Sequence, residues 1–205
     1  PLAIGTFIDA LSNRTGPLGL LDHAILRNGI LRIDDQRRGR QIRYRDLALT
    51  FDRTGEGVER IALSAQGEHG TWSANGTLIG RGGEARRLTL QSKDIAISEL
   101  LGFAEQGTIP VKTDMPLSFN ISIDVDKNSI LTGLSGAITG GKATIILDDP
   151  KAPPIKVDEV HGEFTLSDDG NRIILPLIEF VSSDTHWRIS GDVGIPKAAT
   201  DGWTF

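Results

Sequence analysis

Cysteine is missing from all 205 residues of the chain. This absence excludes a disulfide framework and any metal site with cysteine ligands, although it does not decide between a cytoplasmic and an envelope protein. A surplus of positive charge is missing as well: the formal net charge is −5 and the pI is about 5.4, which argues against a nucleic-acid partner. No apolar run approaches the roughly 18 residues that a membrane-spanning helix needs.

Residue patterns typical of catalysis are also missing. Gly133-Leu134-Ser135-Gly136 lacks the glycine–x–serine–x–glycine spacing of a nucleophile elbow. The histidines show no HxH or HExxH spacing, and surface or turn positions are the simpler interpretation. They are His23, His69, His161 and His186. We therefore expect no catalytic residues, no metal site and no cofactor, and we do not expect an enzyme.

One segment imitates a calcium-binding loop. Residues 124–128 read Asp-Val-Asp-Lys-Asn, which matches the first ligand positions of such a loop. Ser129 stands where the loop needs a glycine for its sharp turn, and Ser135 stands where it needs a bidentate glutamate. We interpret the segment as a hairpin turn between two strands.

What the chain does contain is a repeat centred on a tryptophan. Trp72 and Trp187 lie 115 residues apart, and each is followed four residues later by a glycine, Gly76 or Gly191. The same offset aligns the apolar-Thr-apolar sequence at 88–90 with that at 203–205. An offset of 113 aligns residues 42–51 with 155–164. Self-similarity at a nearly constant spacing predicts two repeated multi-strand modules, in which the tryptophan marks an equivalent place.

The repeat divides the chain into three parts. Residues 1–26 are a lead-in of loop and short helix, with helical spacing at Leu18, Leu21 and Ile25. Residues 27–116 form the first module, with a short helix near 97–103, and residues 117–205 form the second, which ends in mid-unit. Because the sequence starts at Pro1 and stops within the repeat, we interpret it as a piece of a longer protein.

Within these modules, alternating apolar and polar residues predict about twelve strands joined mostly by short turns. The clearest strand is 117–125, where the alternation holds for nine residues. A slip in phase near Arg45 and Asp46 predicts a β-bulge. Residues 130–139 and 142–147 are expected to form a hairpin around Gly140-Gly141.

The number of strands sets the expected architecture. Open twisted sheets of more than about ten strands curl or split. We predict a mostly β fold, a long antiparallel and strongly curved open sheet with the shape of a groove, built from two repeated modules with one to three short helices. A β-sandwich or a β-solenoid is the alternative.

Several segments resemble the AsmA-like proteins of Gram-negative envelopes: residues 24–35, 42–51, 70–80 and 87–101. The resemblance implies an inner-membrane-anchored, periplasmic parent protein, attached through segments outside this sequence. It also implies a long curved β-sheet whose apolar groove conducts phospholipid between the inner and outer membranes, contributing to outer-membrane biogenesis. Phospholipid or another acyl lipid is the expected partner, and envelope proteins are possible further partners.

Apolar positions on the alternating strands are the expected groove residues. An acyl chain laid on them gains about 0.8 kcal/mol per buried methylene. Two other interpretations stay open: a structural or protein-interaction module whose apolar faces meet each other, and, weakest, a metal-dependent hydrolase. The predicted groove residues are Leu47, Leu49, Phe51, Leu63, Trp72, Leu117, Phe119, Ile121, Ile123, Phe164, Trp187 and Ile189.

Overall fold

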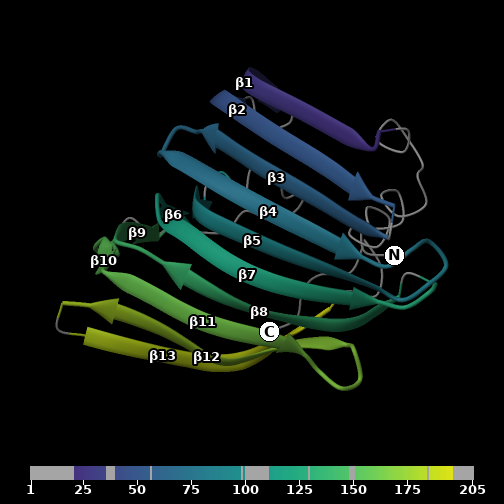
Figure 1. Cartoon of the computed structure of the whole chain (residues 1–205). Coiled ribbons are helices and arrows are strands. Elements are labelled where there is room, and N and C mark those ends of the chain that lie inside the picture. Colours follow the sequence, from purple (N-terminus) through teal and green to yellow (C-terminus); the bar gives the residue numbers. More distant parts are fainter. Residues whose placement is uncertain are drawn as a thin grey trace.

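A computed structural model describes residues 21–35, 40–55, 57–97, 99, 111–128, 130–147, 151–183 and 185–195. Ten strands form one antiparallel sheet in the order β1-β2-β3-β4-β5-β7-β8-β11-β12-β13 (Figure 1). They are β1 (His23–Asp35), β2 (Arg40–Thr54), β3 (Val58–Gln66), β4 (Thr71–Ile79), β5 (Arg86–Ala96), β7 (Pro116–Val125), β8 (Leu131–Gly140), β11 (Glu159–Leu166), β12 (Arg172–Ser182) and β13 (Thr185–Gly194).

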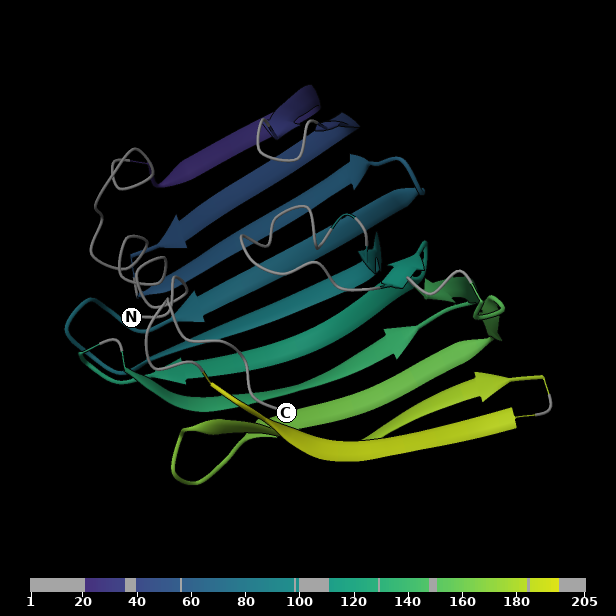
Figure 2. The same ribbon diagram turned by 180° about the vertical axis from the view of Figure 1, so that it is seen from behind.

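The sheet is open, and both modules belong to it. β1 and β13 are its two edges, and they do not pair with each other. The strands bend together, so that the view from behind looks into the hollow of a trough (Figure 2). The predicted curved, open antiparallel sheet is therefore confirmed, and it is one continuous sheet across the boundary between the modules.

A small second sheet lies at one end of the strands. It contains β6 (Val111–Thr113), β9 (Ala143–Leu147) and β10 (Ile155–Val157), in the order β10-β9-β6. The predicted hairpin of 130–139 with 142–147 is therefore wrong: β8 pairs with β7 and β11, whereas β9 leaves the main sheet after Gly140. This departure lets Ala143 and Ile145 of β9 pack beside Met115 and Val157.

The predicted lead-in of loop and short helix, residues 1–26, overlaps the first strand of the sheet. Residues 1–20 lie outside the described part, but β1 already begins at His23, so the helical spacing read through Ile25 is wrong for this residue. Ala24 and Leu26 pair with Phe51 and Leu49 of β2, and this cross-strand pairing outweighs the local spacing. Ile25 points to the other face and is 52% exposed.

Two other local predictions concern a helix and a bulge. Ile97 and Glu99 have helical geometry at the start of the predicted 97–103 helix, and its remaining residues lie outside the described part. The β-bulge predicted near Arg45 and Asp46 is confirmed, because the register of β2 against β3 shifts between Arg45 and Ala48. Asp46, inside this shift, has a φ of 50°.

The sequence repeat is visible in the strand order. β2, β3 and β4 follow one another in the first module, and β11, β12 and β13 follow one another in the second. Trp72 pairs with Ala65 of β3, and Trp187 pairs with Phe180 of β12. β4 has a further neighbour, β5, whereas β13 is the edge of the sheet.

Two glycines of the second module differ in the space around them. A Cβ atom added at Gly136 meets the Phe164 ring at 2.5 Å and the backbone oxygen of Asn120 at 2.8 Å. We predict that Gly136→Ala lowers the free energy of unfolding by about 1–3 kcal/mol, because backbone cannot move aside as a flexible side chain can. Urea denaturation measures this loss, and Gly191→Ala is the matched control, since no described residue lies within 4 Å of its added Cβ. Equal stability of the two variants contradicts the prediction.

Candidate functional site

One face of the main sheet is apolar along its whole width, and we call it the apolar face. On β7, Ile123 pairs with Leu88 of β5 and Leu134 of β8, and the alternation of the strands carries the same face to both edges. The strand registers place all twelve predicted groove residues on it: Leu47, Leu49, Phe51, Leu63, Trp72, Leu117, Phe119, Ile121, Ile123, Phe164, Trp187 and Ile189.

The centre of the apolar face is buried. Phe51, Leu78, Leu88 and Ile123 are each less than 5% exposed and belong to one cluster that reaches from β2 to β7. A second cluster, toward the other end of the same strands, contains Trp72, whose ring meets the Tyr44 ring edge-on at 5.7 Å between centroids. These residues serve the folding core, because burying apolar area is the main term that stabilises a sheet of this kind.

The β13 edge of the apolar face is open instead. Trp187 is 40% exposed and Ile189 is 54% exposed, whereas Trp72, the equivalent of Trp187, is 5% exposed. The predicted groove residues therefore fall into two groups. Those near the centre are buried or half-buried, and the two on β13 offer free apolar surface.

The small sheet covers one end of the apolar face. Val157 of β10 and Met115 are buried in a cluster with Val160 of β11. Ile178 and Phe180 of β12 pack against this cluster while remaining half-buried. The small sheet thus covers this end of the apolar face, and the two residues of β12 that it contacts pair with Trp187 and Ile189 of β13.

The opposite end of the apolar face carries a charge pair that the sequence reading missed. The Arg53 guanidinium donates to the Glu59 carboxylate at 2.7 Å, and the two side chains are 4% and 9% exposed. Arg53 also lies over the Phe51 ring, 5.3 Å from its centroid. β2 continues to Thr54, so that strand alternation puts Arg53 on the same face as Phe51. The sequence alone does not show that the strand extends this far.

The other face of the sheet is polar and is held by exposed ion pairs. Arg87 of β5 donates to Asp124 of β7 through Nε at 2.7 Å, and this hydrogen bond is the main reason why the pKa of Arg87 is raised. A hydrogen bond from Arg188 of β13 lowers the pKa of Glu179 on β12. Exposed pairs of this kind add little to stability.

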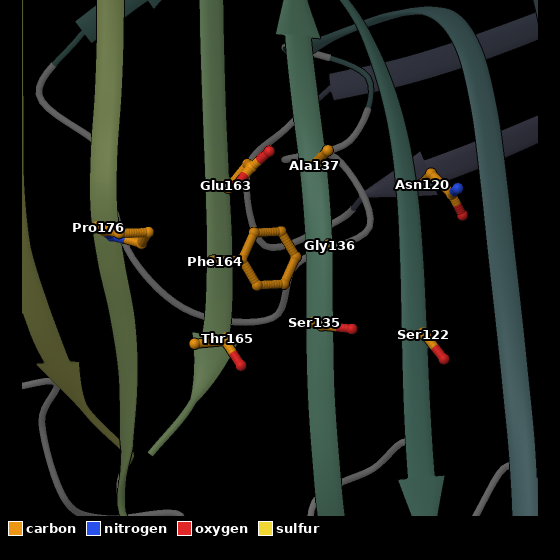
Figure 3. A pocket seen from close by; sticks show the side chains of 9 residues that line it. All are labelled: Asn120, Ser122, Ser135, Gly136, Ala137, Glu163, Phe164, Thr165 and Pro176. Atoms are coloured by element: carbon orange, nitrogen blue, oxygen red, sulfur yellow. The ribbon is translucent and has the colours of Figure 1, made fainter.

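A shallow hollow of about 430 Å³ lies on the sheet near β8 and β11 (Figure 3). Small residues of β8 make room for it, and six of its nine lining residues belong to the polar face. The lining residues are Asn120, Ser122, Ser135, Gly136, Ala137, Glu163, Phe164, Thr165 and Pro176. Figure 3 shows hydroxyl and amide groups spread along parallel rows rather than converging on a point.

The segment that imitates a calcium loop forms a turn. The Asp126 carboxylate accepts hydrogen bonds from the backbone N–H of Asn128 at 2.8 Å and of Ile130 at 2.9 Å. Its Oδ1 atom therefore caps the connection between β7 and β8. The hairpin-turn interpretation is confirmed.

Titratable residues elsewhere form pairs rather than clusters. His23 contacts Asp52, and His161 contacts Glu159 at 2.8 Å. Across the described ranges, no three histidine, aspartate or glutamate side chains lie close enough to hold a metal ion. Across the same ranges, no helix has the length and hydropathy to cross a membrane.

The turn between β11 and β12 makes a testable electrostatic prediction. Hydrogen bonds from the Ser167 hydroxyl and then from Asn171 lower the pKa of Asp169 from 3.8 to about 2. Because the folded pKa is depressed, the carboxylate stabilises this turn above pH 3.8, and the contribution is lost as the pH falls toward 2. We expect an NMR titration of the Asp169 carboxyl carbon to have its midpoint near 2, and Ser167→Ala to raise it. A midpoint at 3.8 in both proteins contradicts this assignment.

The geometry defines the class of the protein: an antiparallel β protein built on one large open sheet with an apolar face, of which a small three-stranded sheet covers one end. Comparisons of the chain with family models, curated proteins and solved structures found no match.

Proposed function

We propose that the apolar face binds the acyl chains of phospholipid or a related lipid, as a segment of a longer lipid-transfer protein. The observation that carries this proposal is the apolar face itself, which continues across ten strands of one open sheet and reaches an exposed edge at Trp187 and Ile189. The proposed setting is the periplasm of a Gram-negative envelope, with an anchor in the inner membrane supplied by other parts of the parent protein.

The dimensions of the trough suit an acyl chain. A ten-residue strand such as β7 or β13 is about 34 Å long at ~3.4 Å per residue. One leaflet of a bilayer has about half of a ~30 Å hydrocarbon thickness, so a strand is longer than one acyl chain. Each methylene that leaves water for the apolar face contributes about 0.8 kcal/mol without a directional bond, which lets the chain slide.

Burial of the central residues restricts where the lipid lies. Phe51 and Ile123 are 2% and 4% exposed, so the acyl chain lies on the β12–β13 part of the apolar face, where Trp187 and Ile189 are accessible. Half-buried Phe180 and Ile178 of β12 continue this surface inward toward β11. Non-specific apolar contact of this kind needs no catalytic group.

The same burial favours a second candidate, a structural or interaction module of the envelope. In that case the centre of the apolar face serves only as a core, and the exposed edge meets another protein. The two candidates differ in one property, which is whether lipid stays with the purified protein.

Organic extraction of the purified chain followed by mass spectrometry tests the proposed function. We expect phospholipid or fatty acid in the extract at a substantial fraction of the protein concentration. An extract without acyl lipid, together with no binding of added fluorescent fatty acid, overturns the proposal in favour of the structural module.

A further inference from the structure

Two arginines face each other on the polar face of the sheet, where β1 pairs with β2. Arg32 of β1 is directly opposite Arg43 of β2 in the strand register. Side chains in this relation have Cβ atoms about 4.5–5.5 Å apart, and like charges there destabilise the pair. Arg45, two residues farther along β2, pairs with uncharged Gln66 of β3. All three arginines are exposed, and we call them the basic patch.

Arginines elsewhere on the polar face have a carboxylate opposite them. Arg87 of β5 pairs with Asp124 of β7 and donates to it at 2.7 Å. Arg188 of β13 pairs with Glu179 of β12 and donates to it at 3.0 Å. In the part of the chain that the structure describes, no carboxylate forms such a pair with any arginine of the basic patch. The positive charge of the patch is therefore not balanced within the sheet.

The acidic residue beside the basic patch has another partner. The Asp34 carboxylate, two residues along β1 from Arg32, accepts a hydrogen bond from the side-chain amide of Gln41 at 2.6 Å. The chain as a whole has a formal net charge of −5, so the patch is a local positive surface on an acidic protein. A partner that carries negative charge turns the unfavourable arginine pair into a favourable contact.

An exposed aliphatic side chain lies next to these arginines. Gly29 and Leu31 of β1 pair with apolar-face residues of β2, so Ile30 between them points to the polar face beside Arg32. Ile30 is 60% exposed. Basic side chains interleaved with large apolar ones are typical of surfaces that lie on anionic lipid, where cations meet the headgroups and apolar groups enter below them. A nucleic-acid duplex offers the phosphates without such an apolar layer.

We propose that the basic patch and Ile30 form a docking surface for an anionic phospholipid bilayer. The guanidinium groups donate to lipid phosphates, and the negative charge of the phosphates offsets the repulsion between Arg32 and Arg43. β1 is one edge of the main sheet, so docking places this edge at the bilayer surface (Figure 1). The inference does not depend on acyl-chain binding, because it concerns different residues on the opposite face of the sheet.

Flotation of the full chain with lipid vesicles tests the proposal. The vesicles contain equal parts of phosphatidylglycerol and phosphatidylcholine, and vesicles of phosphatidylcholine alone are the neutral comparison. In the double variant Arg32→Gln with Arg43→Gln, binding to the anionic vesicles should fall roughly 10- to 30-fold, because each arginine near an anionic surface contributes roughly fivefold. The melting temperature of this variant should not fall, because the substitutions remove a like-charge pair.

Arg87→Gln with Arg188→Gln is the matched control, since it removes the same charge from the same face. β5 is three strands from β2, about 14 Å at ~4.8 Å per strand, and β13 is farther away, so both sites lie beyond the Debye length of about 8 Å. This control and Ile189→Asp should both bind the anionic vesicles as the unchanged chain does. The Ile189→Asp result separates vesicle docking from acyl-chain binding.

Three outcomes overturn the proposal. The first is an unchanged chain that binds anionic vesicles no better than neutral ones. The second is an equal loss of binding in the two double variants. The third is binding of a DNA duplex instead of vesicles, weakened by Arg32→Gln with Arg43→Gln alone, because the patch then belongs to a nucleic-acid partner.

Discussion

Replacing Ile189 by aspartate is expected to weaken acyl-chain binding by roughly 10- to 100-fold while leaving the fold unchanged. Ile189 is 54% exposed on the apolar face of β13, so a bound acyl chain covers it, and an aspartate carboxylate there would have to lose its hydration under the chain. Loss of the apolar contact alone costs about 1.5–3 kcal/mol, and about 1.4 kcal/mol corresponds to tenfold in affinity. Titration with a fluorescent long-chain fatty acid measures the change.

Ser190→Asp is the matched control for this variant. Ser190 is the next residue of β13 and points to the polar face, so the same charge is added within one residue of the same place. Its affinity for the fatty acid should equal that of the unchanged chain. If Ile189→Asp and Ser190→Asp bind equally well, the β13 part of the apolar face does not hold the acyl chain.

The second large effect concerns the buried centre of the same face. Phe51→Ala should lower the free energy of unfolding by about 3–5 kcal/mol, because Phe51 is 2% exposed in the cluster that joins β2 to β7. For a chain of this size, the melting temperature should fall by roughly 6–20 °C. Differential scanning calorimetry measures both quantities.

Ile79→Ala supplies the comparison, because Ile79 is 52% exposed on the polar face and sits beside buried Leu78. Its stability should stay within about 0.5 kcal/mol of that of the unchanged chain. A Phe51→Ala variant that melts at the temperature of the unchanged chain would show that the centre of the trough is not a folding core. In that case the whole apolar face, rather than its β13 edge, becomes available to a ligand.

Sequence reasoning succeeded where structure follows from local periodicity. Alternation within a strand decides which residues share a face, so the twelve predicted groove residues lie together although they come from six strands. The bulge at Asp46 and the turn capped by Asp126 are local features as well. Each could be read from a few neighbouring residues.

Properties that depend on distant neighbours could not be read in this way. Trp72 and Trp187 are equivalent in the repeat, yet only Trp72 is buried, because β4 has β5 beside it and β13 is an edge. Strand β9 has ordinary alternation, but its partners are β6 and β10 rather than the preceding strand. The ion pair between Arg53 and Glu59 could not be predicted, because the point at which β2 ends depends on its pairing with β3.

Contact between an acyl chain and Trp187 is the most direct measure of the central claim. In a Trp72→Phe and Trp203→Phe double variant, Trp187 is the remaining tryptophan, and brominated acyl chains quench tryptophan fluorescence on contact. We predict saturable quenching by brominated phospholipid, which in Ile189→Asp needs roughly 10- to 100-fold more lipid and in Ser190→Asp needs no more. Fluorescence that stays unchanged at brominated-lipid concentrations high enough for binding would contradict the assignment of this face to lipid.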